Sequence, residues 1–163
     1  VPEDRKKEGI YAIQGIRFNT TIEVLGQFLK NGRYDWDKEL ALTKEYVDDV
    51  MQTKYAGVEQ PIGRLSGGNQ QKVVVSKWLG QDMDLIIYDE PTKGIDIAAK
   101  EDIFRTIQDF SSQGIGVIFI SSDLEEVIRV SDRIIVIRDG MAVCEMENRD
   151  LTVQDIMNKI FNV

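Results

Sequence analysis

The chain has 163 residues, of which 42% are hydrophobic and 29% charged, and its formal net charge is −8. This composition is typical of a globular domain with a buried core, and an acidic chain without a basic run is a poor partner for nucleic acid. The absence of histidine excludes imidazole acid–base chemistry and most zinc sites. The single cysteine, Cys144, lies in an apolar-alternating stretch, which indicates a sheet or core residue in a reducing compartment.

The front of the chain is predicted to be helical. Apolar residues at helical spacing favour a first helix from Thr20 to Leu29, and residues 31–35 favour a turn. Asp35 or Asp37 is expected to cap a second helix, which ends before the break at residues 57–61. The apolar stripe expected on this second helix comprises Leu40, Val47, Val50 and Met51.

After Gly63 the pattern changes to alternating helices and strands. A glycine-rich stretch leads into a helix that is predicted to run to about Leu79, and another helix is expected after Asp96. Residues 84–88 and 116–120 are short apolar runs, typical of strands buried on both faces. These runs are far too short to span a bilayer.

The last part is predicted to contain a helix, a hairpin and a final helix. Ser122 and Glu125 have the spacing of a capping box, and Asp139-Gly140 favours a tight turn between two strands. Thr152 and Asp155 are expected to start the final helix. The order of elements predicts an α/β fold with a parallel sheet covered by helices, whose ligands lie at the carboxyl ends of the strands.

Two adjacent carboxylates come directly after the first predicted strand, in the segment Leu-Ile-Ile-Tyr-Asp-Glu-Pro-Thr. Asp89, at the end of the strand, is a candidate ligand for Mg²⁺, directly or through water. Glu90 is a candidate general base for a water that attacks a terminal phosphate. The alternative is that both residues only begin a loop and cap the next element of the chain.

A glycine-rich octet, Leu-Ser-Gly-Gly-Asn-Gln-Gln-Lys, begins at Leu65. Glycines allow a backbone to approach a ligand closely, and a serine with unpaired N–H groups at a helix N-terminus favours an anion. The octet therefore predicts a phosphate clamp at Ser66, Gly67 and Gly68. The alternative is a plain N-cap with a Gly-Gly turn.

The octet, the apolar-Asp-Glu strand and the segment Gly94-Ile95-Asp96 together resemble the ABC transporter ATPase family. They match its signature motif, its Walker B strand and its D-loop, whose aspartate corresponds to Asp96; an N-cap role for Asp96 is equally compatible. The resemblance implies the C-terminal part of a P-loop ABC ATPase domain. A helical subdomain is then expected at about residues 5–60, and the signature helix, Walker B strand, D-loop and C-terminal core at about 61–163.

Several features depart from the family pattern. No Gly-x-x-x-x-Gly-Lys-[Ser/Thr] phosphate loop occurs, so we expect a fragment that binds ATP weakly or not at all by itself. Ser122 stands at the position of the family's switch histidine, where it could instead be a helix cap. Glu3 stands where the family has its Q-loop glutamine, which weakens the case for ordinary Mg²⁺ coordination there.

Four stretches of the sequence are similar to one subgroup of this family. They are the octet, Glu-Asp-Arg-Lys at residues 3–6, residues 89–96, and Ser-Ser at residues 121–122. This subgroup is the second ATPase half of the tandem subunit of bacterial ribose, galactose and xylose importers. The resemblance implies that residues 66–69 face ATP held by the other ATPase half. It also implies permease subunits as partners, a solute-binding protein as an indirect partner, and a peripheral location at the cytoplasmic face of the cell membrane.

Two other functions compete with this interpretation. A regulatory or interaction module could keep the ABC half-fold without nucleotide hydrolysis, although the intact Asp89 and Glu90 argue against that loss. A chromosome-maintenance ABC ATPase would need long coiled-coil heptads, which the sequence lacks.

Overall fold

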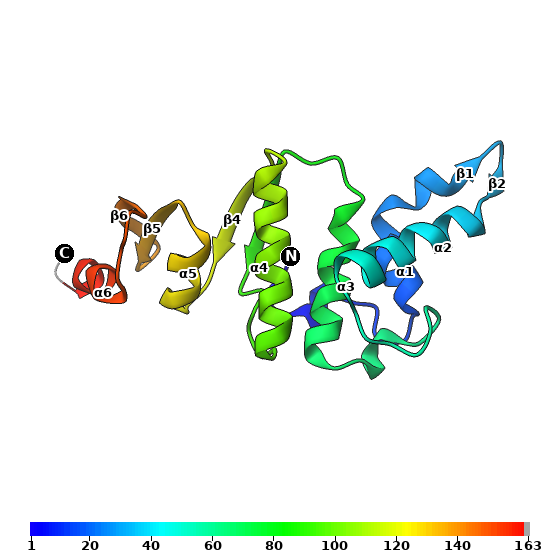
Figure 1. The fold of residues 1–163 in the computed structure, drawn as a ribbon, viewed down its shortest axis with the longest axis horizontal. Helices are drawn as coiled ribbons and strands as arrows, with labels where there is room; N and C mark the ends of the chain where they lie inside the picture. Colours follow the sequence, from blue (N-terminus) through cyan, green and yellow to red (C-terminus); the bar gives the residue numbers. More distant parts are fainter. Residues whose placement is uncertain (162–163) are drawn as a thin grey trace. The chain divides into compact units, whose positions relative to one another are not determined.

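A computed structural model describes residues 1–161 of the chain (Figure 1). Contacts divide the chain into two compact units, Val1–Ile118 and Phe119–Val163. Helices and small sheets alternate along the sequence, and the predicted α/β fold class is confirmed. The predicted helical subdomain at about residues 5–60 stays a prediction. Within the described residues, no helix is long and apolar enough to cross a membrane.

The first unit begins with short helical segments and a small hairpin. These elements are the π-helix η1 (Arg5–Gly9), α1 (Ile16–Thr21), the 3-10 helix η2 (Ile22–Phe28), and the strands β1 (Leu29–Lys30) and β2 (Arg33–Tyr34). The predicted single helix from Thr20 to Leu29 is therefore wrong. The Thr21 hydroxyl donates to the Arg17 carbonyl (2.8 Å), and Val24 has non-helical angles (φ −124, ψ 15). β-Branched residues disfavour helices, which helps explain why regular α-helix ends here.

The next elements are α2 (Trp36–Lys44) and the π-helix η3 (Glu45–Val50). Asp35, rather than Asp37, caps α2 by accepting the Lys38 N–H at 3.0 Å. Val47 and Met51 are fully buried as predicted, but Val50 is 39% exposed. Because a π-helix turns less per residue than an α-helix, the apolar stripe shifts and leaves Val50 outside.

Helix α3 (Gly67–Leu79) is the central helix of the first unit and comes after the short 3-10 helix η4 (Ile62–Arg64). Nearly every residue from Gly68 to Lys77 is buried. The core cluster beside it consists of Ile16, Val47, Ile62, Leu65 and Val73. The predicted end of this helix at about Leu79 is confirmed.

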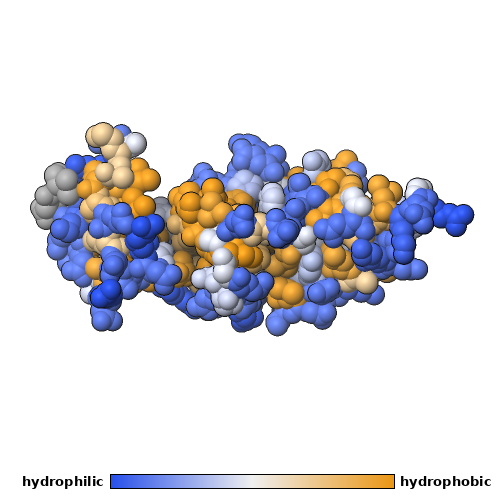
Figure 2. Space-filling view, turned by 90° about the horizontal axis from the view of Figure 1, so that it is seen from above, coloured by the Kyte–Doolittle hydropathy of each residue, from blue (hydrophilic) through white to orange (hydrophobic). Residues whose placement is uncertain are grey.

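Strand β3 (Leu85–Asp89) pairs with β4 (Gly116–Ile120), and α4 (Ile97–Ser112) connects them. The buried face of α4 comprises Ala99, Ile103, Phe104, Thr106, Ile107 and Phe110. The expectation that both strands are buried on both faces is wrong. Ile86 and Tyr88 are buried, but Leu85 is 52% and Ile87 47% exposed. Alternate strand residues point to opposite faces, so only one face is covered. Figure 2 shows that apolar residues are visible at several places on the surface of the described chain.

The second unit contains α5 (Leu124–Val130), the hairpin β5 (Arg133–Arg138) and β6 (Met141–Glu147), and α6 (Val153–Phe161). The predicted hairpin turn is confirmed, since Asp139 and Gly140 have φ values of 52 and 77. Thr152 and Asp155 exchange hydrogen bonds at the start of α6, also as predicted. Ile134, Val136 and Ile156 form the core of this unit.

The predicted capping box at the start of α5 is wrong. Asp123 is the N-cap, and its Oδ1 accepts the N–H groups of Glu125 (3.1 Å) and Glu126 (3.4 Å). The Asp123 carboxylate lies within reach of both N–H groups. Asp123 therefore makes the capping hydrogen bond that the predicted capping box assigned to the Ser122 hydroxyl.

Candidate functional site

The two candidate catalytic carboxylates lie where β3 ends. Asp89 is the last residue of β3, and Glu90 comes next with a φ of 45. Such a left-handed backbone is uncommon for a residue with a long side chain and stores strain. The Lys93 N–H donates to the Glu90 carbonyl at 3.2 Å and closes a turn. This turn therefore holds the Glu90 backbone in one conformation, and the backbone sets the direction of the Glu90 side chain.

Asp89 fits a metal that is shared with a substrate. Among the described residues, no group of three or more His, Cys, Asp or Glu side chains could hold a metal ion. Mg²⁺ keeps several waters and is commonly bound by one or two carboxylates together with substrate phosphates. The half-buried carboxylate of Asp89 at a strand end can supply such a ligand.

The glycine-rich octet forms the start of α3. Ser66 is the N-cap, and its Oγ accepts the backbone N–H of Asn69 (3.4 Å) and the Asn69 side-chain amide (3.0 Å). The Asn69 Oδ1 in turn accepts the Lys54 N–H at 3.1 Å. Ser66 is exposed, whereas Gly67 is half-buried and Gly68 is buried, so the exposed part of this helix start is the residue that carries the hydroxyl.

Both glycines are in close contact with other segments. A Cβ at Gly68 would lie 2.7 Å from the Ala99 Cβ and 2.8 Å from an Asp96 carboxylate oxygen. A Cβ at Gly67 would lie 2.7 Å from an Arg5 guanidinium nitrogen and 3.4 Å from the Gly94 carbonyl oxygen. The start of α3 at Gly67 and Gly68, here called the glycine turn, therefore packs directly on the loop that precedes α4.

Asp96 and Glu3 have defined partners in the first unit. Asp96 caps α4 by accepting the Ala99 N–H at 3.0 Å, as the N-cap alternative predicted. Glu3 is exposed and forms an ion pair with Lys93 at 2.5 Å. The Glu3 carboxylate raises the pKa of Lys93 through this hydrogen bond and its charge.

Ser122 belongs to the second unit. It is exposed and immediately precedes Asp123, the N-cap of α5. Its neighbour Ser121 accepts the Asp123 N–H at 3.0 Å and donates to Glu126 at 3.3 Å. The helix-cap alternative for Ser122 is thereby excluded, because Asp123 fills that role.

The sequence analysis missed two residues that contact the site, Arg5 and Lys93. The Arg5 Nη1 donates to the Lys93 carbonyl at 3.3 Å, and these residues are 88 positions apart. Periodicity cannot reveal a contact at that separation. The only signal in the sequence is that both residues lie inside stretches whose spelling matches the subgroup, residues 3–6 and 89–96.

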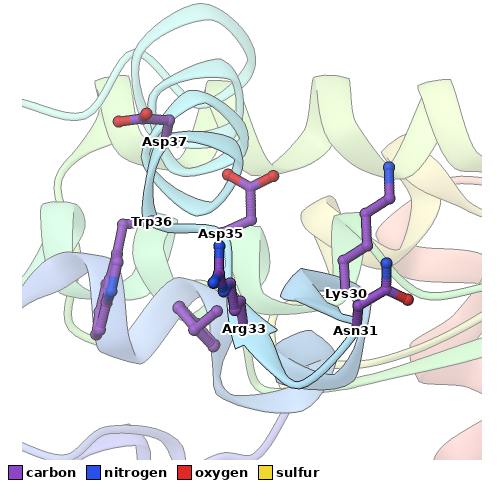
Figure 3. A pocket seen from close by; sticks show the side chains of 7 residues that line it. Lys30, Asn31, Arg33, Asp35, Trp36 and Asp37 are labelled. Atoms are coloured by element: carbon purple, nitrogen blue, oxygen red, sulfur yellow. The ribbon is translucent and has the colours of Figure 1, made fainter.

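A surface hollow of the first unit lies elsewhere, at the β1–β2 hairpin and the start of α2 (Figure 3). It is lined by Lys30, Asn31, Arg33, Tyr34, Asp35, Trp36 and Asp37. None of these residues belongs to the predicted nucleotide site, and the lining mixes both charges. The hollow is therefore not a second candidate for the phosphate clamp.

Solved structures identify the class of this fold. The dimeric structure of MJ0796, a bacterial ABC transporter cassette, matches with a TM-score of 0.75 and 20% identity, over 91% of this chain and 62% of that chain. A post-hydrolysis state of the same cassette bound to ADP and Pi matches with a TM-score of 0.74 and 20% identity, over 87% and 60% of the two chains. The fold is that of an ABC ATPase cassette.

Curated relatives specify the family further, although no family model matches the chain. The arabinose import ATP-binding protein AraG of Pectobacterium atrosepticum is 41% identical over 160 residues, and the ribose import ATP-binding protein RbsA of Roseobacter denitrificans is 41% identical over 157. Both alignments cover 96% of this chain but only 31% and 30% of the relatives' length. The chain is homologous to a part of these sugar-import ATP-binding proteins.

Proposed function

We propose that the chain is part of an ATP-hydrolysing subunit that powers the import of a sugar or related solute. The observation that carries this proposal is the backbone of Glu90, held in a left-handed conformation directly after the strand that ends in Asp89. Strain of this kind is concentrated at functional sites. The identity to arabinose and ribose import ATP-binding proteins supports the choice of reaction and solute class.

In this proposal Ser66, Gly67 and Gly68 bind the γ-phosphate of ATP held by another ATPase half. The N-terminus of a helix of 13 residues offers unpaired N–H groups and a partial positive charge to an anion. The Ser66 oxygen already accepts from Asn69, so its own O–H can be donated to a phosphate oxygen. Asn69 thus acts on the nucleotide through Ser66.

The carboxylates divide the work at the chain's own nucleotide. Asp89 holds Mg²⁺, which supplies charge stabilisation on the phosphates when it is bound. Glu90 orients the attacking water and accepts its proton, which requires a fixed carboxylate within hydrogen-bond reach. Glu3 lines this nucleotide site. Ser122, which belongs to the second unit, offers a hydroxyl in place of the imidazole of the switch histidine. Asp96 holds the start of α4 against the glycine turn.

The same proposal defines the partners. The second ATPase half supplies a phosphate loop, and the glycine turn of this chain binds the ATP that this loop holds. Permease subunits in the membrane are moved by the ATPase halves. The chain spans about 31% of the AraG relative, and we propose that it acts within a longer subunit at the cytoplasmic face of the membrane. We expect the chain alone to bind ATP weakly or not at all and not to hydrolyse it.

The test is Glu90→Gln in the full-length subunit, reconstituted with its permease in lipid vesicles. Removing the base should slow ATP turnover by roughly a hundredfold or more, while ATP binding is retained. Glu125→Gln is the matched control, because this exposed carboxylate lies at the start of α5 and has no assigned role. Unchanged turnover in Glu90→Gln would favour the alternative function, a regulatory or interaction module whose ABC half-fold does not itself hydrolyse nucleotide.

A further inference from the structure

The segment before α1 runs alongside the candidate catalytic residues. The Val1 nitrogen donates to the Ile87 carbonyl at 2.8 Å, and the Asp89 N–H donates to the Val1 carbonyl at 3.0 Å. At its other end, the buried Lys77 of α3 donates to the Gly9 carbonyl at 2.7 Å. Hydrogen bonds thus attach residues 1–9 both to the end of β3 and to helix α3.

Between these attachments, two side chains of the segment hold the loop after β3. Glu3 pairs with the Lys93 ammonium at 2.5 Å, and Arg5 Nη1 donates to the Lys93 carbonyl at 3.3 Å. The Lys93 N–H donates to the Glu90 carbonyl. Arg5 is therefore connected, through one residue, to the strained backbone of Glu90.

The same guanidinium lies against the glycine turn. Its Nη2 occupies the space that a Cβ at Gly67 would enter, at 2.7 Å. The Arg5 Nε is buried and finds no acceptor among residues 1–161. An unsatisfied buried donor is unfavourable, so the position of Arg5 is not explained by the hydrogen bonds of Arg5 alone.

We infer that Arg5 is a positioning residue that ties the glycine turn to the loop carrying Glu90. The planar guanidinium donates to the Lys93 carbonyl through Nη1 and at the same time places Nη2 against Gly67. The single point charge of a lysine cannot do both. Binding of a phosphate at the turn is thereby coupled to the alignment of Glu90. This inference rests on the proposed function and adds to it a residue that touches neither ATP nor the attacking water.

The test compares Arg5→Ala and Arg5→Lys with Lys6→Ala in the full-length subunit reconstituted with its permease. Both Arg5 variants should lower kcat by roughly ten- to hundredfold, the effect expected of a misaligned reacting group, with the KM for ATP nearly unchanged. Lys6→Ala changes an exposed neighbouring cation and should leave both constants unchanged. Full activity of Arg5→Lys would overturn the inference, since charge alone would then suffice.

A double-mutant cycle gives an independent readout. Gly67→Ala should displace the guanidinium, so adding it to Arg5→Ala should lower kcat much less than it does in the wild type. Additive losses would contradict the coupling. Glu90→Gln is measured in parallel: if it is inactive while both Arg5 variants are normal, only this inference fails. If Glu90→Gln turns over normally, the proposed function fails and this inference fails with it.

Discussion

The contact between the glycine turn and the start of α4 makes Gly68→Ala an informative change. The added Cβ would lie 2.7 Å from the Ala99 Cβ and 2.8 Å from the Asp96 carboxylate. Carbon atoms pack best at about 3.5–4.0 Å, so α3 and α4 must separate or Asp96 must abandon its cap. Neither neighbour is the loose end of a long side chain, and the methyl group has nowhere to move.

The expected magnitude is the difference between two effects. Forcing a methyl group into a packed contact costs about 1–3 kcal/mol, whereas replacing glycine by alanine in a helix regains up to about 1 kcal/mol. The gain is smaller in the first turn, so we expect Gly68→Ala to lower the free energy of unfolding by about 1–2 kcal/mol. For a chain of 163 residues this corresponds to a Tm lower by roughly 2–8 °C.

The assay is thermal and urea unfolding monitored by circular dichroism. Gly26→Ala is the matched control, because nothing lies within 4 Å of the Cβ it would add. Gly67→Ala should cost less than Gly68→Ala, since the atom it meets is the flexible end of Arg5. A Gly68→Ala chain as stable as the Gly26→Ala chain would show that the two helix starts are not in contact.

Two further changes test the interior around α3. Lys72→Met should lower the free energy of unfolding by about 3 kcal/mol, because it leaves the Asp102 carboxylate, only 15% exposed, without its Lys72 partner. Arg105 is the exposed partner of the same carboxylate, and Arg105→Ala should change the free energy of unfolding by less than about 0.5 kcal/mol. Equal losses in urea titrations would refute this distinction. Burial lowers the pKa of Lys77 below its usual 10.5, so the unfolded chain binds more protons between the two pKa values, and stability rises with pH in that window. Lys77→Met should remove that rise in unfolding titrations between pH 7 and about 10.5, and an unchanged slope would contradict it.

Local features of the fold could be predicted from the sequence because neighbours determine them. Asp35, Asp96 and Thr152 start helices through hydrogen bonds to residues three positions away. The Asp139-Gly140 turn depends on residues that tolerate a left-handed backbone. These patterns need no knowledge of the rest of the chain.

Features that depend on distant packing could not be predicted in the same way. The apolar run of β3 indicated two covered faces, yet Leu85 and Ile87 are exposed, since the described residues cover only one. Lys72 is buried and forms an ion pair with Asp102. The sequence around Lys72 alone would predict a lysine that is exposed to solvent. At the site, the octet and the carboxylate pair were visible as motifs.

The most direct test of the account is a structure of the full-length subunit with its permease, trapped with ATP by Glu90→Gln. We predict that the Ser66 hydroxyl and the N–H groups of residues 67 and 68 lie within about 3.5 Å of the γ-phosphate of ATP held by the other ATPase half. A structure in which these residues face away from the triphosphate would contradict the central claim.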